Sequence, residues 1–189
     1  MSKLPSHLGG HCNVNHLDFG AIKYLSEKFD IKSALDLGCG LGSMKYEFQK
    51  LGIDFVGIDG DFVIKRPKDV NVLIHDYNTG PSNVSQEFDL GWSTEFVEHV
   101  DEEFIPNYME DFLKCKIVAL SYAPEGKPGH HHVNCRDESY WIETFAKYGF
   151  TFDWMTTQVM REKSTMPREF IRDYGLCFIN NKYFTTFNS

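Results

Sequence analysis

The stretch Ala34-Leu35-Asp36-Leu37-Gly38-Cys39-Gly40-Leu41-Gly42 decides the fold of this chain. The apolar run over 33–37 predicts a short buried strand, and glycines then stand at alternate positions. Glycine permits a sharp turn with positive φ and lets a ligand approach the backbone closely. A helix is predicted next, over 42–51. In a parallel α/β sheet a ligand binds at the carboxyl end of such a strand, so this loop is the first candidate site.

Further strands and helices alternate along the chain. Strands are expected at 55–58, 70–74, 88–92 and 116–122, and helices at 17–29, 101–113 and 137–148. This alternation predicts βαβ units and a mainly parallel sheet. The tail differs, with strands expected at 150–155, 175–179 and 182–187 and a helix at 167–174. A single α/β domain with an antiparallel C-terminal strand is therefore predicted.

The composition fits one domain and disfavours polyanionic partners. The chain has 189 residues, of which 42% are hydrophobic, and this is enough for one core. The net charge of −8 repels phosphate backbones and disfavours nucleic acid as a partner. Five cysteines without a C-x-x-C pair predict reduced thiols and a cytoplasmic location. No run approaches the roughly 18–20 apolar residues of a membrane span, so no membrane partner is expected.

Two further strands are followed by acidic residues. Asp59 ends the second predicted strand, about 20 residues beyond the glycines, where a carboxylate can accept both hydroxyl protons of a ribose. The third strand runs into His75-Asp76-Tyr77. A nicotinamide-dependent oxidoreductase is a rival interpretation, but its G-x-G-x-x-G fingerprint requires glycine where this chain has Ser43. The basic cluster Lys65, Arg66 and Lys68 is interpreted as a solvated loop.

The D-x-G-x-G-x-G pattern resembles the first motif of the Rossmann-like (class I) S-adenosylmethionine-dependent methyltransferases. The resemblance extends from about Ser33 to Phe152. It implies a three-layer fold with a mostly parallel seven-stranded sheet and an antiparallel C-terminal strand. It also implies S-adenosylmethionine as cofactor, with Asp36 facing the methionine end, Asp59 on the ribose and Asp76 on the adenine amino group. The residues expected to bind the cofactor are Asp36, Gly38, Cys39, Gly40, Asp59, Gly60, Asp76, Tyr77 and Ser93.

Glu95, Glu98 and His99 follow the fourth predicted strand and form an E-x-x-E-H pattern. If this segment is helical, the side chains share one face and can ligate a divalent cation. The pattern is similar to that of the ubiquinone-biosynthesis O-methyltransferases and the small-RNA 3′-end 2′-O-methyltransferases, where a divalent metal assists methylation of an oxygen. The RNA group adds a histidine after the fifth strand. His131 is the best match for it here, with His130 and His132 as alternatives.

This second resemblance implies a catalytic role for Glu95, His99 and His131, and a metal site made by these residues with Glu98. A metal lowers the pKa of a bound hydroxyl, and mixed carboxylate and histidine ligands suit Mg²⁺, Mn²⁺ or Zn²⁺. Without a metal, a neutral imidazole is a suitable general base. The alternative is a purely structural role for these side chains, because many methyltransferases that use no metal carry a Glu-His pair at this place.

A polar segment, His11–Asp18, precedes the first helix. In this family such a segment often folds over the cofactor as a lid, which brings His16 and Asp18 within reach of the pocket. The alternative is helix capping by Asn15 or Asp18. The single domain is accordingly divided into a lid and helix (1–32), a cofactor-binding core (33–155) and a C-terminal helix with closing strands (156–189). The histidine-rich N-terminus and the run Gly57–Asp61 resemble uncharacterised small phage and bacterial methyltransferases, and a phage protein would act in the host cytoplasm.

The sequence as a whole predicts methyl transfer to a small polar acceptor. The favoured acceptor is a hydroxyl on a sugar or sugar-like molecule, and a nitrogen atom is the alternative. A non-catalytic S-adenosylmethionine-binding regulatory module is the rival from another class of protein. The glutamate and histidine pattern favours chemistry over that rival, and no sequence feature indicates an oligomeric state.

Overall fold

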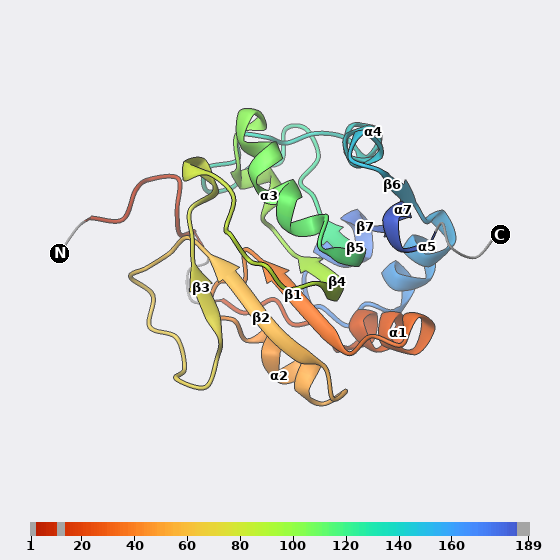
Figure 1. Ribbon diagram of the computed structural model, residues 1–189. Helices are drawn as coiled ribbons and strands as arrows, with labels where there is room; N and C mark the ends of the chain where they lie inside the picture. The colour runs from red at the N-terminus through yellow and green to blue at the C-terminus, as the bar shows by residue number, and fades with distance from the viewer. Residues whose placement is uncertain (1–2, 11–13, 185–189) are drawn as a thin grey trace.

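The computed structural model describes residues 3–10 and 14–184, and its centre is a seven-stranded sheet in the order β3-β2-β1-β4-β5-β7-β6 (Figure 1). Neighbouring strands from β3 to β5 are parallel, whereas β7 pairs antiparallel with both β5 and β6. This confirms the predicted mixed sheet and its antiparallel C-terminal strand. The strands are β1 (Ser33–Leu37), β2 (Asp54–Asp59), β3 (Val72–Ile74), β4 (Phe88–Ser93), β5 (Cys115–Ser121), β6 (Phe150–Phe152) and β7 (Gly175–Asn180).

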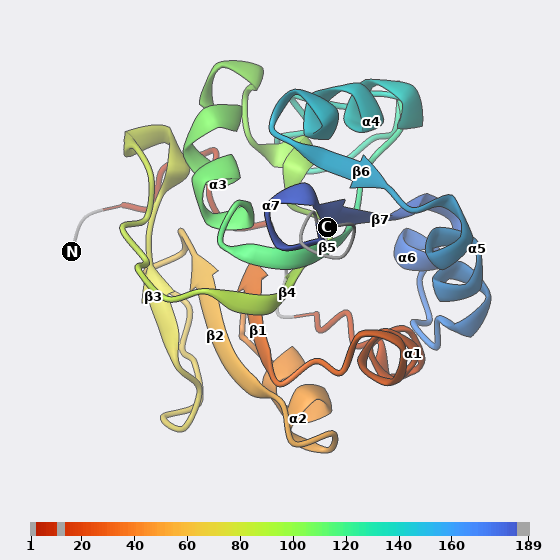
Figure 2. The same ribbon diagram turned by 45° about the vertical axis from the view of Figure 1, so that its right-hand side comes forward.

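Helices cover both faces of the sheet and make the outer two of three layers (Figures 1 and 2). They are α1 (Phe19–Phe29), α2 (Met44–Gln49), α3 (Ile105–Phe112), α4 (Glu138–Lys147), α5 (Trp154–Lys163), α6 (Phe170–Tyr174) and α7 (Asn181–Phe184). The helix α1 begins where the carboxylate of Asp18 accepts the amide of Ala21, at 3.0 Å, and it ends at Asp30 in the left-handed region. The helices α1 and α5 pack side by side.

Two apolar cores fill the spaces between the layers. Side chains alternate along β5, so Val118 and Leu120 join the core beneath α3 and α4. Ile117 and Ala119 point the other way, into the core beneath α1, α2 and α5. Because both faces are buried, the central strands are nearly continuous apolar runs, which is the pattern seen in the sequence. These two cores hold the strand ends, and the loops that follow them, in fixed positions.

One predicted tail strand is too long and another is wrong. The strand expected at 150–155 ends at Phe152, because Asp153 accepts the amide of Thr156 at 2.9 Å and starts α5, which was not predicted. The range 182–187 was expected to be a strand, but its residues 182–184 belong to α7 and the others lie outside the described residues. The helix expected at 101–113 begins with a separate 3₁₀ turn, Glu102–Phe104, before α3.

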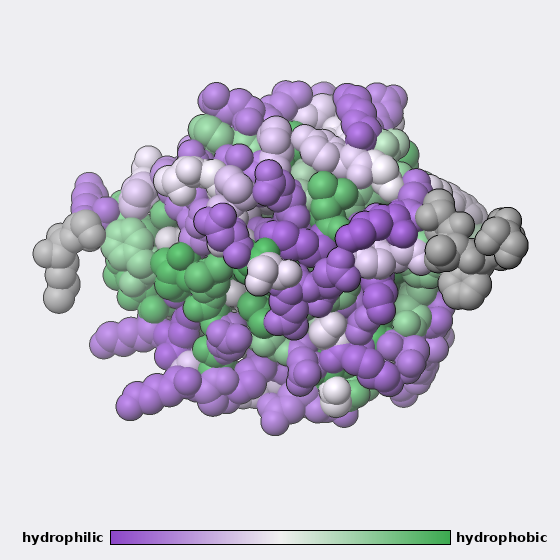
Figure 3. Space-filling view, in the orientation of Figure 1, coloured by the Kyte–Doolittle hydropathy of each residue, from purple (hydrophilic) through white to green (hydrophobic). Residues whose placement is uncertain are grey.

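Apolar surface gathers at the β3 edge of the sheet, on the left of the view in Figure 3. Its exposed side chains include Phe62, Val63, Leu73 and Ile74. The strand β3 has three residues, so the row of unpaired backbone groups at this edge is short. In the described part of the chain, no helix combines the length and apolar character needed to cross a bilayer.

Candidate functional site

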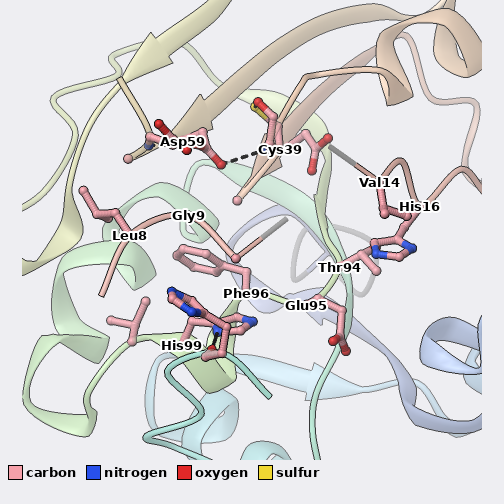
Figure 4. Close-up of a pocket in the computed structure, with 18 of the residues that line it drawn as sticks. Leu8, Gly9, Val14, His16, Cys39, Asp59, Thr94, Glu95, Phe96 and His99 are labelled. Atoms are coloured by element: carbon pink, nitrogen blue, oxygen red, sulfur yellow. Dashed lines mark hydrogen bonds between the residues drawn. The ribbon is translucent and has the colours of Figure 1, made fainter. Parts of the chain in front are cut away.

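A cleft of about 470 Å³ opens beside the carboxyl ends of the parallel strands, where the strand order reverses between β1 and β4. Asp59 and Cys39 lie at one end of the cleft, Glu95 and His99 lie at the other, and Phe96 stands between the two ends (Figure 4). The cleft therefore joins the glycine loop to the glutamate and histidine pattern found in the sequence. The predicted cofactor residues that line it are Asp36, Gly38, Cys39, Gly40, Asp59, Gly60, Asp76 and Tyr77.

The loop after β1 is shaped by its glycines. Gly38 has a φ of 71°, and a Cβ atom there would lie 2.7 Å from the ring of Phe96. Only glycine combines this backbone conformation with so close a neighbour. The amides of Gly38 and Cys39 both donate to the carbonyl of Ile58, at 2.9 and 3.1 Å. The loop is thus tied to β2 and crosses the floor of the cleft.

Asp36 precedes this loop and is buried at the floor of the cleft. Burial raises the pKa of its carboxyl well above the ordinary value, and the nearby Asp59 carboxylate raises it further. A positively charged group in the cleft would favour the ionised form of Asp36. This environment suits the cationic methionine end of the expected cofactor.

Asp59 ends β2, and both oxygens of its carboxylate accept hydrogen bonds. Its Oδ2 accepts the amide of Gly40 at 2.8 Å, and its Oδ1 accepts the amide of Asp61 at 2.9 Å and Nη2 of Arg66 at 2.7 Å. The interpretation of Arg66 as part of a solvated loop is therefore wrong, since its side chain is only 10% exposed. No sequence pattern indicated this contact, because the loop between β2 and β3 has no regular structure.

Asp76 and Tyr77 follow β3 and differ in their roles. The carboxylate of Asp76 accepts the amide of Asn78 at 3.0 Å and lies 2.9 Å from His7 Nε2. Tyr77 contributes to the cleft wall, but its hydroxyl donates to the buried carboxylate of Asp111, at 2.7 Å. The hydroxyl of Tyr77 thus fastens the segment after β3 to α3.

Ser93 does not line the cleft, contrary to the prediction. It is fully buried, and its hydroxyl donates to the carbonyl of Leu37 at 2.9 Å, which links β4 to β1. The side chains alternate across the sheet, so the neighbours Trp92 and Thr94 reach the cleft instead.

The N-terminal segment crosses the cleft, and its residues 7–10 and 14–17 are part of the lining. Leu8 lies against Gly60, where a Cβ atom would be 2.4 Å from Leu8 Cδ2, and Gly10 lies in the same way against His130. His16 lines the cleft, as predicted, while Asp18 is fully buried and serves as the cap of α1. The intervening residues 11–13 lie outside the described residues.

Glu95, Glu98, His99 and His132 form a cluster at the other end of the cleft. Each offers one ligand atom, and these atoms lie within 4.8 Å of one another. The segment that carries the first three is not one helix: Glu95 has a φ of 55°, and a 3₁₀ turn covers Val97–His99. The left-handed backbone at Glu95 therefore replaces the helical face that the sequence spacing predicted.

The histidine that joins this cluster is His132, and the choice of His131 is corrected. The backbone at His131 is left-handed, with a φ of 46°, and its ring lies 6.0 Å from that of His7, measured between centroids. The Nδ1 atom of His132 lies 2.9 Å from the carbonyl of Lys127, so this nitrogen donates and Nε2 keeps a lone pair. His130 contributes only its carbonyl, which accepts Nδ1 of His99 at 2.7 Å.

The electrostatics of the cluster suit a positively charged ligand. Glu98 is fully buried, and among the described residues neither of its carboxylate oxygens has a hydrogen-bond partner. Burial raises the pKa of Glu95 and, more strongly, that of Glu98, which the charge of Glu95 raises further. Burial lowers the pKa of His99 to about 4, so its imidazole is neutral near neutral pH. Two carboxylates and two imidazoles are a donor set that fits a divalent cation.

The backbone holds the two halves of this cluster together. The amides of Val133 and Asn134 both donate to the carbonyl of Glu98, at 3.0 Å, which fixes the loop after β5 against the segment after β4. Gly129 leaves room for His132, since a Cβ atom there would lie 2.0 Å from His132 Nε2. The arrangement of the cluster is thus set by main-chain contacts and by one small residue.

Comparison with known proteins relates the chain to others through its fold. No family model and no curated protein sequence matches it. Among solved structures, a TehB-like S-adenosylmethionine-dependent methyltransferase from Corynebacterium glutamicum is 16% identical, with a TM-score of 0.61, over 85% of this chain and 87% of the other. The methyltransferase domain of bacterial CtHen1 is 14% identical, with a TM-score of 0.59, over 85% and 94% of the two chains.

A further similar structure was solved with a cofactor bound. Magnesium protoporphyrin IX methyltransferase from Synechocystis, with bound S-adenosylmethionine, is 14% identical, with a TM-score of 0.57, over 85% of this chain and 76% of the other. At these identities the likeness establishes the fold alone. The chain thus has the Rossmann-like fold of the class I methyltransferases, as the glycine motif predicted.

Proposed function

We propose that this chain is an S-adenosylmethionine-dependent methyltransferase that methylates a hydroxyl of a small polar acceptor with the help of a divalent cation. The observation that carries the proposal is the continuity of the cleft. One end has the glycine loop with the carboxylates of Asp36 and Asp59, and the other has the cluster around Glu98. A cofactor placed along the glycine loop directs its methyl group toward the Glu/His cluster.

The cofactor end offers a group for each part of the ligand. Asp59 and Asp76 both line the cleft, and in this proposal Asp59 accepts the ribose hydroxyl protons and Asp76 accepts the adenine amino group. Asp36 supplies negative charge at the methionine end. S-adenosylmethionine, when bound, supplies an electrophilic methyl group on sulfur. The chain then has to orient the acceptor and exclude water, and Phe96 and the N-terminal segment enclose the space where this occurs.

At the acceptor end, Glu95 is the candidate general base. Its pKa is raised by burial, which brings a carboxylate nearer to the basicity needed to take a proton from a hydroxyl. Glu98, His99 and His132 would hold the cation, which when bound lowers the pKa of an acceptor hydroxyl. The hydroxyl oxygen of Thr94 is buried beside Glu95 without a partner, and it suits an acceptor rich in hydroxyl groups, such as a sugar.

Calorimetry with S-adenosylhomocysteine tests the cofactor site first. Methyl transfer from labelled S-adenosylmethionine to a panel of sugars and other polyhydroxyl metabolites, with Mn²⁺, Mg²⁺ or a chelator, then tests the reaction. We expect transfer that the chelator and Glu98→Gln abolish, while Glu103→Gln, a change of an exposed glutamate, leaves it intact. Tight NADH binding without affinity for S-adenosylhomocysteine would refute the proposal, as would methylation of nitrogen alone with chelator-resistant activity.

A further inference from the structure

Arg66 connects the loops that follow β1 and β2. Its Nε donates to the carbonyl of Gly40, its Nη1 to the carbonyl of Asp61 and its Nη2 to Oδ1 of Asp59, each at 2.7 Å. The side chain is 10% exposed, so water competes little for these bonds. A planar guanidinium with several donors in a fixed geometry can satisfy three acceptors at once, which a lysine ammonium cannot do with the same geometry.

Arg66 is suited either to block the ribose site or to support Asp59 from outside the cleft, and the direction of its contact distinguishes these two roles. Gly40, Asp59 and Asp61 all line the cleft, whereas Arg66 does not. The guanidinium therefore reaches Asp59 from behind the cleft wall and leaves the cofactor space clear. A side chain that blocks the ribose site would have to enter the cleft. Because Arg66 does not line the cleft, the geometry favours a role in supporting Asp59. The positive charge of Arg66 supports the same role, because it is a countercharge for Asp59, which lies near the buried Asp36.

We propose that Arg66 is a positioning residue that holds the Asp59 carboxylate, and the glycine loop at Gly40, in the arrangement that grips the ribose of the cofactor. The inference rests on the proposed function, since it assigns a ligand group to Asp59. Arg66 acts through Asp59 and does not touch the ligand. Its loss is expected to weaken the hold on the Asp59 carboxylate, which the amides of Gly40 and Asp61 still contact, and to loosen the loop that carries Gly40.

The experiment compares two ligands, S-adenosylhomocysteine and its 2′-deoxy counterpart, by calorimetry. In the wild type, the 2′-hydroxyl should increase affinity. In Arg66→Met, we expect about a tenfold or greater loss of affinity for S-adenosylhomocysteine, and a clearly smaller loss for the 2′-deoxy ligand. Arg66→Lys, which keeps the charge, should fall between. Lys65→Met and Lys68→Met remove exposed positive charges from the same loop and should leave both affinities unchanged.

The outcomes distinguish the two proposals. If the wild type binds S-adenosylhomocysteine but Arg66→Met weakens both ligands equally, Arg66 is merely structural and the inference fails while the proposed function stands. If the wild type binds neither ligand, both proposals fail. If Arg66→Met does not fold, a double-mutant cycle that combines Arg66→Lys with Asp59→Asn takes its place. Once Asp59 is neutral, Arg66→Lys should have no further effect on ribose selectivity.

Discussion

His99 Nδ1 donates to the carbonyl oxygen of His130 at 2.7 Å, and this bond joins the segment after β4 to the loop after β5. Because a carbonyl only accepts, Nδ1 carries the hydrogen and Nε2 keeps the lone pair that a metal requires. His132 is oriented in the same way by the carbonyl of Lys127. Both imidazoles are thus held in the metal-binding tautomer by backbone atoms.

Replacing Glu98 should raise the stability of the metal-free protein and remove its response to a divalent cation. We expect metal-free Glu98→Gln to be more stable than the wild type by about 1–3 kcal/mol, because it removes a buried, unpartnered carboxylate. The rise in melting temperature that Mn²⁺ produces in the wild type should be absent. Urea unfolding and thermal melts with and without Mn²⁺ measure both effects. The exposed Glu103→Gln is the control, and a destabilised Glu98→Gln protein would contradict the account of this site.

Gly129→Ala should weaken metal binding by displacing His132. The new Cβ atom would lie 2.0 Å from His132 Nε2, so the ring must move away from the cluster. We expect Mn²⁺ affinity to fall about tenfold or more, as it does when groups that orient a ligand are lost. Gly126→Asn is the matched control, since Gly126 has a φ of 77°, which asparagine tolerates, and has open space around it. Equal Mn²⁺ affinity in Gly129→Ala and wild type would rule out His132 as a ligand.

Asp36 should make cofactor binding depend on pH. Its folded-state pKa is raised above the ordinary 3.8, so the native state retains a proton that the unfolded state releases. Stability is therefore expected to fall as pH rises from the ordinary pKa through the raised one. A cationic ligand favours ionised Asp36, so affinity for S-adenosylmethionine, whose methionine end carries a positive sulfonium, should rise over the same range. Calorimetry over a pH series should show this slope in the wild type and a flatter one in Asp36→Asn.

His7→Ala should strengthen cofactor binding. His7 lies 2.9 Å from the Asp76 carboxylate on the cleft side, where the adenine amino group is expected. A partly exposed polar contact of this kind contributes up to about 1 kcal/mol, so releasing Asp76 should improve affinity by up to about fivefold. Titration with S-adenosylhomocysteine measures the change, with Lys3→Ala as a control at an exposed position of the same segment. Weaker binding would show instead that His7 supports the ligand.

Tyr77→Phe should affect folding more than binding. The change leaves one oxygen of the buried Asp111 carboxylate without the Tyr77 donor, while Lys114 continues to pair with the other. A loss of about 1–3 kcal/mol in the free energy of unfolding is expected, with little change in cofactor affinity. Urea titration gives the first quantity and calorimetry the second. Tyr46→Phe, which removes an exposed hydroxyl, should cost less than about 0.5 kcal/mol.

The sequence predicted that the carboxylates after three strands lie together, because the determinants of this arrangement are local. Each of Asp36, Asp59 and Asp76 stands at or just after the end of its own strand, and parallel strands bring those ends to one edge of the sheet. The glycine at position 38 could be interpreted for the same reason, because a tight turn at a strand end requires glycine.

Other features depended on contacts that no local pattern encodes. The choice between His131 and His132 is decided by a left-handed residue and by the carbonyl of Lys127. The role of Arg66 depends on how an irregular loop returns to β1. The helix α5 was missed because few of its residues are buried, namely Thr156, Thr157 and Met160, and these do not form a clear apolar stripe.

The path of the N-terminal segment has a consequence for the rate of turnover. A single stretch of chain lies against Gly60 at the cofactor end, through Leu8, and against the loop of His130 at the acceptor end, through Gly10. The demethylated cofactor and the methylated acceptor would both have to leave past this stretch. Its opening is therefore a step that the release of each product requires. Motions of such covering segments often limit enzyme cycles more than the bond-making event does. In an active enzyme, kcat would then report on how fast the amino-terminal arm lifts.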